Sequence, residues 1–202
     1  MRLALDAAGA RGDVDASLVE RAQIDALVGM HAAFADIALV PATLRDEMRR
    51  RVVNGALFLS AAPVLLLGEE AIDLGALRRI VIGWDGGVAA SAAARAVLPL
   101  LRRQTRIELV LVDPIADSDA FGAEPGAQAA GWLARHGPTV DVVRLPHEGR
   151  PVAETIIRHA GDVDADLLVM GGYGHSRLRE RVFGGTTRSV VDEADRPVLL
   201  AR

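Results

Sequence analysis

The sequence predicts an α/β protein with an open, doubly wound parallel sheet of five strands in the order 3-2-1-4-5, preceded by a shortened copy of the same unit. Three observations predict this. Apolar runs without polar alternation recur in the second part of the chain, as is typical of parallel strands buried on both faces. Helical patterns separate these runs, and such alternation is typical of parallel sheets with right-handed crossovers. A stretch near the start of the chain also repeats a stretch near its end.

The expected strands are short apolar runs, and the first four end at glycine or proline. A helical apolar period fills the segments between them. Pro151 suits a first helical position, and a threonine suits the cap of the last helix. The expected strands are 78–85, 107–113, 140–145, 165–172 and 197–202, and the expected helices are 88–103, 127–137, 151–160 and 186–195.

Length and composition exclude several classes of protein. The chain has 202 residues, a net charge of −4 and no cysteine. This length supports a core that needs no cross-link, and the lack of cysteine excludes disulfides, thiol catalysis and thiolate metal sites. All 23 basic residues are arginine, which excludes a phosphate-binding or Schiff-base lysine. The negative charge argues against a nucleic-acid partner.

The sequence predicts neither an export signal nor a membrane span. Its first residues carry acids where a signal peptide needs an apolar stretch. The segment 52–68 is uncharged, but it is short for a span and is interrupted by Asn54, Gly55 and Pro63. We expect a buried helix followed by a buried strand there, and a soluble, cytoplasmic protein.

Residues 1–76 resemble a shortened copy of residues 77–202. The motif PVLL at 63–66 recurs at 197–200, and an earlier group of residues recurs in the same order at a constant offset. Two such sequence repeats in the same order indicate that half of the folding unit is duplicated. Segment 23–34 then takes the place of the third helix, and the copy lacks its first two strands. The matched pairs are Ala35 and Ala165, Asp36 and Asp166, Arg49 and Arg179, Arg51 and Arg181, Val52 and Val182, and Gly55 and Gly185.

The segment 171–188 carries the candidate binding site, because it joins a buried strand to a helix and is rich in glycine. Glycines let main-chain amides converge on an anion. The following helix adds its N-terminal amides and the positive end of its dipole, and its threonines can cap it or offer hydroxyls to a phosphate. From spacing alone, the alternative is a long connecting loop with ordinary turn glycines. The candidate residues are Gly171, Gly174, Gly184, Gly185, Thr186 and Thr187.

The spacing Gly171-x2-Gly174-x9-Gly184 resembles the nucleotide-binding signature of the universal stress protein family. The opening IVIGWDG, and the order of elements over 77–202, are similar to that family as well. The resemblance implies that the chain binds an adenine nucleotide, ATP with or without Mg, and acts in stress-response signalling or scaffolding. The positions it implies are Asp85 beside the nucleotide, Val112 beside the adenine, Met170 and Gly171 at the end of the fourth strand, and Gly174 and Gly184 in the phosphate loop.

Two residues depart from the family pattern. ATP-binding members usually carry serine or threonine after the last glycine, where this chain has Gly185 followed by Thr186. A serine usually follows the first strand, where this chain has Gly87. Asp85 also has an alternative role, because aspartate is a preferred N-cap residue of helices.

The first copy is not expected to bind nucleotide. Proline and leucine replace two of its three site glycines, and these residues remove an amide donor and add bulk. Its last strand would be an exposed apolar edge unless it were paired. In the family that the chain resembles, last strands pair antiparallel across a two-fold axis. We therefore expect 63–67 to pair with 197–201 within the chain, and a homodimer besides. The replacing residues are Pro41, Leu44 and Asn54.

The leading interpretation is a universal stress protein that binds nucleotide without catalysis. The sequence contains no GxSxG, no HExxH and no paired carboxylates with a base, and its histidines lack metal-ligand spacing. One alternative is an interaction module with a vestigial pocket. Another is an adenylating transferase, but GGYGHS and WDGGVAAS match neither the HxGH nor the SGGxDS loop of such enzymes.

Overall fold

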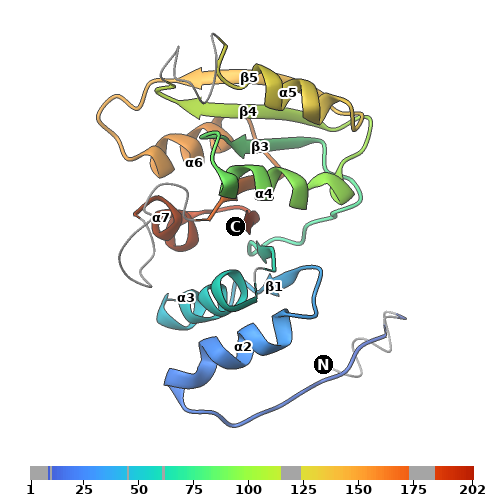
Figure 1. Cartoon of the computed structure of the whole chain (residues 1–202), viewed down its shortest axis with the longest axis vertical. Helices are drawn as coiled ribbons and strands as arrows, with labels where there is room; N and C mark the ends of the chain where they lie inside the picture. Colours follow the sequence, from blue (N-terminus) through green and yellow to red (C-terminus); the bar gives the residue numbers. More distant parts are fainter. Residues whose placement is uncertain (1–8, 10, 45, 61, 115–123, 173–184) are drawn as a thin grey trace.

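A computed structural model of the chain describes residues 9, 11–44, 46–60, 62–114, 124–172 and 185–202 (Figure 1). Within these residues, one seven-stranded sheet runs through the molecule in the order β1-β2-β7-β6-β3-β4-β5. Its strands are β1 (Ala38–Val40), β2 (Val64–Leu66), β3 (Arg79–Gly83), β4 (Arg106–Val112), β5 (Thr139–Leu145), β6 (Leu167–Gly171) and β7 (Val198–Ala201).

The second part of the sheet has the predicted topology. Strands β3 to β7 are all parallel, and β3 lies between β4 and β6. Counted in chain order, these five strands follow the order 3-2-1-4-5, so the fold prediction is confirmed. We call β3 to β7 and their helices the second unit, and the elements from α2 to β2 the N-terminal unit.

The helices depart from the predicted bounds where local chemistry ends them. The helix expected over 88–103 stops at Ala96 and continues as a short 3-10 turn, because Pro99 has no N–H to donate. The last helix begins at Gly185, so Thr186 lies inside it and the predicted threonine cap is wrong. The helices are α2 (Ile24–Ala32), α3 (Asp46–Asn54), α4 (Val88–Ala96), α5 (Ala127–Ala134), α6 (Val152–Asp162) and α7 (Gly185–Glu193), with 3-10 turns η1 (Arg21–Gln23) and η3 (Leu98–Leu100) and a π-helical turn η2 (Gly55–Ser60).

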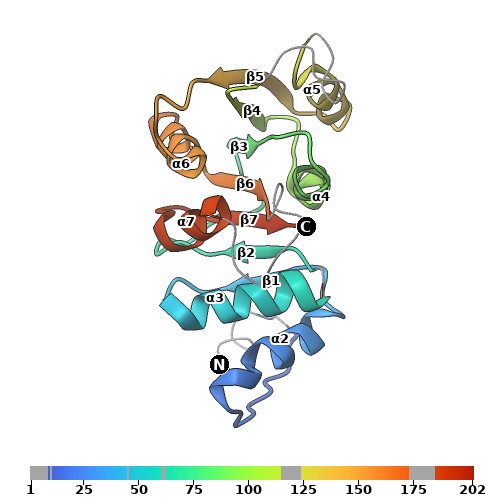
Figure 2. The same cartoon turned by 60° about the vertical axis from the view of Figure 1, so that its left-hand side comes forward.

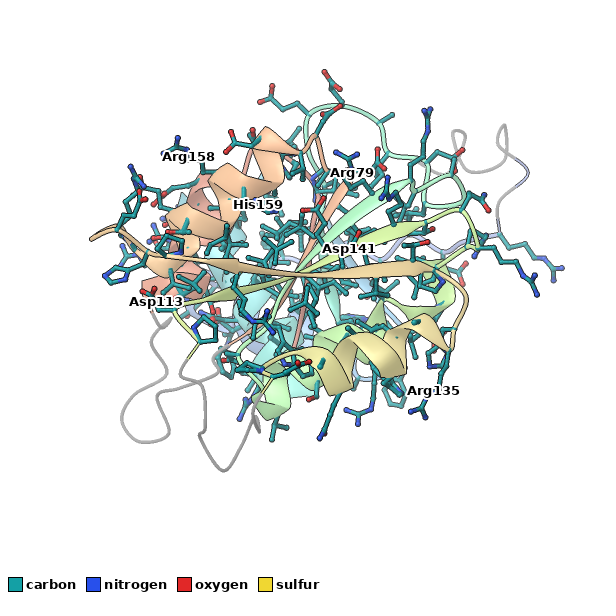
Figure 3. All side chains as sticks on the ribbon, turned by 90° about the horizontal axis from the view of Figure 1, so that it is seen from above. Arg79, Asp113, Arg135, Asp141, Arg158 and His159 are labelled. Atoms are coloured by element: carbon teal, nitrogen blue, oxygen red, sulfur yellow. The ribbon has the colours of Figure 1, made fainter. Side chains whose placement is uncertain are left out.

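Helices cover both faces of the sheet (Figure 2). Along β3, Val81 packs with α6 and α7 on one face, while Ile80 and Ile82 pack with α4 on the other. This alternation is why the strands read as continuous apolar runs. A polar contact also joins α6 to β4, since Nε2 of His159 lies 2.7 Å from Oε2 of Glu108 (Figure 3).

The uncharged segment 52–68 forms the end of α3, the turn η2 and the strand β2. Gly55, Ala56 and Leu57 are buried, as is all of β2. The expected helix followed by a strand is therefore confirmed. Among the described residues, no helix is both long and apolar enough to cross a bilayer.

The two units meet where β2 pairs antiparallel with β7. Leu65 lies opposite Leu199, and both side chains are fully buried. Strand β1 runs parallel to β2, just as β6 runs parallel to β7, so the two strand pairs mirror each other across this junction. The pairing predicted between 63–67 and 197–201 is confirmed over Val64–Leu66.

The β2–β7 junction predicts the cost of truncating Leu65. Leu65→Ala should lower the free energy of unfolding by about 2–5 kcal/mol, because it removes a buried side chain and leaves a cavity. Leu39→Ala is the control, since Leu39 is 56% exposed on the edge strand β1, and it should change stability by no more than about 0.5 kcal/mol. Urea denaturation measures both. Equal losses would contradict a continuous core across the junction.

Candidate functional site

The carboxyl ends of β3, β4 and β6 meet at one edge of the sheet. Gly83 of β3 pairs with Val110 of β4 on one side and with Met170 of β6 on the other. The chain leaves β3 toward β4, whereas β6 arrives on the opposite flank, so the winding direction reverses here. Open α/β sheets bind ligands outside such a reversal point. Asp85, Val112, Met170 and Gly171 are therefore brought to one edge, as predicted.

Asp85 shapes the turn between β3 and α4. Its Oδ1 accepts the N–H of Gly87 at 2.8 Å, and Gly86 adopts a left-handed conformation with φ +73°. The N-cap residue of α4 is Gly87, with no side-chain cap, so Asp85 supports the helix start without being its N-cap. A glycine suits position 87, because a β-carbon there would lie 2.9 Å from Oδ1 of Asp85.

Gly171 brings the end of β6 against the first turn of α4. A β-carbon built on Gly171 would lie 2.5 Å from the backbone nitrogen of Ala90 and 2.6 Å from the carbonyl carbon of Ala89. Any larger residue would push these two elements apart. The first-turn amides of a helix lack intrahelical acceptors and carry the positive end of its dipole. Gly171 therefore brings the end of β6 next to a positively polarised helix start.

Apolar side chains line the sheet beside this turn. Met170 is buried, and a β-carbon on Gly83 would lie 3.2 Å from its Cγ. Val112 is half-buried and packs against the same cluster as Met170. Trp84, on the opposite face, packs in the α4 cluster, as expected of a core tryptophan.

The glycine-rich segment is described only at its two ends. Gly174 and Gly184 lie outside the described residues. Gly185 begins α7 and is exposed, and among the described residues no atom lies within 4 Å of a β-carbon built on it. Thr186 is also exposed, whereas Thr187 is buried. Helix α7 lies on the side of the sheet toward which β3 and β5 point (Figure 1).

Arg188 does not require a bound anion to explain its place in the first turn of α7. Its Nε lies 3.7 Å from Oδ2 of Asp192, one turn along the same helix. Asp192 also lies 3.7 Å from the guanidinium of Arg50 on α3. Arg188 therefore has a counter-charge within the protein, which it shares with Arg50.

Two residues at the same edge were missed by the sequence analysis. Asp113 follows β4 with φ +43°, and its Oδ2 contacts Nδ1 of His147, the second residue after β5. The backbone N–H of His147 donates to the same oxygen at 3.3 Å. These hydrogen bonds from His147 lower the pKa of Asp113 below its ordinary value. Asp113 lies at one end of the sheet in Figure 3. Polar residues one and two positions after the ends of two neighbouring strands were the available signal.

We expect the Asp113–His147 contact to hold at neutral pH and to be lost only in acid. A lowered carboxyl pKa in the folded protein contributes stability above the unfolded pKa, and this contribution disappears as the pH falls through the folded value. NMR titration of the Asp113 carboxyl carbon should give a midpoint below that of an ordinary aspartate. His147→Ala should raise this midpoint, whereas His136→Ala, on an exposed histidine beyond α5, should not. Identical midpoints in the three proteins would refute the contact.

Together, the described residues offer main-chain donors, a carboxylate and an apolar wall. No group of three or more histidine or acidic side chains in the described parts of the chain could hold a metal ion. In chemical terms, a helix start beside a closely approaching glycine backbone suits an anionic group, and the apolar wall suits a ring.

Known proteins resemble the chain in sequence and in structure. A universal stress protein of a Synechocystis species is 47% identical over 49 residues, which are 24% of this chain and 17% of that protein. A universal stress protein of Methanocaldococcus jannaschii is 33% identical over 61 residues, which are 30% of this chain and 34% of that protein. The aligned region thus spans about a third or less of these relatives.

Among solved structures, a universal stress protein from Archaeoglobus fulgidus superposes with a TM-score of 0.72 at 16% identity, covering 98% of this chain and 71% of that one. A universal stress protein from Lactobacillus plantarum superposes with a TM-score of 0.50 at 24% identity, covering 66% of this chain and all of that one. At these identities the likeness establishes the fold. The family model described as "Universal stress protein family" matches residues 76–202. Since this match covers more than half of the chain, the protein belongs to the universal stress protein family.

Proposed function

We propose that the protein binds one adenine nucleotide, ATP with or without Mg, at the carboxyl edge of the second unit, and acts in the stress response by binding rather than by turnover. The observation that carries this proposal is the contact of Gly171 with the first turn of α4, beside Asp85 and at the reversal point of the sheet. A polyphosphate needs main-chain donors that it can approach closely. A glycine backbone against a helix start provides that chemistry.

The same edge suits the remainder of an adenine nucleotide. Val112, which is half-buried, offers apolar surface against which a base can pack, and Met170 lies buried beneath the same edge. The carboxylate of Asp85 is an acceptor with several lone-pair sites, which suits the exocyclic amine of adenine. Gly174 and Gly184 are proposed from the sequence to complete the phosphate loop.

We propose further that residues 1–76 are a truncated, degenerate copy and 77–202 a complete unit. The mirrored strand pairs on either side of the β2–β7 junction support this. The stretch that repeats part of the phosphate loop folds in the N-terminal unit as the helix α3. A regular helix satisfies its own amides and leaves no loop to wrap a phosphate. We therefore expect each chain to bind one nucleotide.

A second candidate is an interaction module whose pocket has lost its ligand. The observation that favours it is the exposed surface at Gly185, where no atom of the described residues lies within 4 Å of a β-carbon. The hydroxyl usual in ATP-binding members is absent there, although there is room for it. The two candidate functions differ in whether the remaining main-chain donors suffice to bind a nucleotide without that hydroxyl.

Calorimetric titration with Mg–ATP tests the proposal directly. We expect one site per chain and a rise in Tm, because a ligand that binds the folded state stabilises it. Gly174→Val should abolish binding while leaving the circular dichroism spectrum unchanged. Absence of both heat and thermal shift in the unaltered protein would favour the vestigial pocket. Steady ATP hydrolysis that Asp85→Asn removes would contradict action by binding alone.

Adding the missing hydroxyl should strengthen nucleotide binding. Gly185→Ser fits the space that the described residues leave at this position and should tighten ATP binding by about five- to tenfold, the effect of one typical hydrogen bond of roughly 1 kcal/mol. Gly185→Ala is the matched control, since it also improves helix propensity but offers no donor. Titration of the three proteins decides the question. Equal affinities of the serine and alanine variants would show that α7 does not touch the phosphates.

A further inference from the structure

The turn η2 of the N-terminal unit lies against the start of the glycine-rich segment in the second unit. A β-carbon built on Gly172 would lie 3.4 Å from Cδ1 of Leu57, which is 1% exposed. The N–H of Gly172 donates to the carbonyl oxygen of Ala201 at 2.7 Å. The next residue, Arg202, places its guanidinium over the ring of Phe58, 4.8 Å from the centroid. Leu57 and Phe58 therefore contact the ends of both β6 and β7.

The turn η2 is fixed in place on its other side as well. A β-carbon on Gly55 would lie 2.5 Å from the carbonyl oxygen of Asp25, and one on Gly29 would lie 2.4 Å from Cβ of Leu59. These two glycines let α2 and η2 approach at the backbone. The π-helical turn, an uncommon geometry that is often found at functional sites, is thus clamped between α2 and the sheet.

Two sets of residues consequently pack against the backbone at 171–172, and we call each set a wall. Ala89 and Ala90 of α4 contact Gly171 from within the second unit, while Leu57 contacts Gly172 from the N-terminal unit. The first wall belongs to the complete unit itself. The second wall exists only because the β2–β7 pairing holds the N-terminal unit beside the edge where we place the nucleotide.

We propose that Leu57 and Phe58 are positioning residues of the nucleotide site, so that a unit that does not itself bind nucleotide sets the affinity of the one that does. This inference rests on the proposed function. The wall at Gly172 fixes where the chain leaves β6, and hence where the phosphate-binding backbone begins. Because coupling between two sites is reciprocal, bound nucleotide also stabilises η2, and the N-terminal unit becomes the part of the protein that responds to it.

Two matched leucine variants test the proposal. Leu57→Ala should weaken ATP binding and speed amide exchange of Gly172 in the nucleotide-free protein, each by about tenfold, within the usual range of coupling between sites. Leu133→Ala removes an equally buried leucine, but Leu133 lies on α5, which packs against β5 and takes no part in the β2–β7 pairing. This control should change both quantities by less than about twofold. Leu57→Met should behave like the unaltered protein.

The outcomes separate this inference from the proposed function. If the unaltered protein binds no ATP, the proposed function fails and the inference fails with it, because both concern the same site. If it does bind ATP, the Leu57 variants decide the inference alone. If Leu57→Ala leaves exchange and affinity unchanged, or Leu133→Ala alters them equally, the inference is overturned. Should Leu57→Ala not fold, Phe58→Leu, on a half-buried ring, tests the same wall. Saturating ATP should also slow exchange over Gly55–Ser60 more than over Ala127–Ala134, and equal slowing would contradict the coupling.

Discussion

The antiparallel pairing of β2 with β7 is the interaction on which the rest of the structure depends. Strand β7 would otherwise be an apolar sheet edge, and such edges invite association with other chains. Here the edge is covered from within the chain, with Leu65 and Leu199 fully buried opposite each other. The pairing extends a five-stranded parallel sheet into a mixed sheet of seven and joins both units in one core.

The same pairing gives the N-terminal unit a role that its own sequence does not suggest. The unit has a helix in place of the phosphate loop, and its edge strand β1 is only three residues long. Nevertheless, it places η2 against Gly172, next to the strand ends where the second unit gathers Asp85, Val112 and Met170. On our proposal, the N-terminal unit thus contributes through its position, as part of the wall of the nucleotide site in the second unit.

The features that could be predicted from the sequence are those that depend on local sequence patterns. Continuous apolar runs located the strands of the second unit, and the repeated PVLL predicted the β2–β7 pairing. Contacts between distant segments left no such signature. Neither the packing of Gly171 on Ala89 nor the bond between Asp113 and His147 follows from periodicity, because each joins elements far apart in the chain. Most of helix α3 was not predicted. Its sequence resembles a segment of the second unit that was expected to form a loop, so the resemblance argued against a helix.

The central claim is that nucleotide meets the protein where Gly171 touches the start of α4. Amide chemical-shift mapping by NMR during an ATP titration tests it most directly. The account predicts saturable shifts concentrated at Gly87, Ala89, Gly171 and Gly185, with a smaller response in η2. Shifts confined to the ends of β1 and β2, or no shifts at saturating ATP, would contradict it.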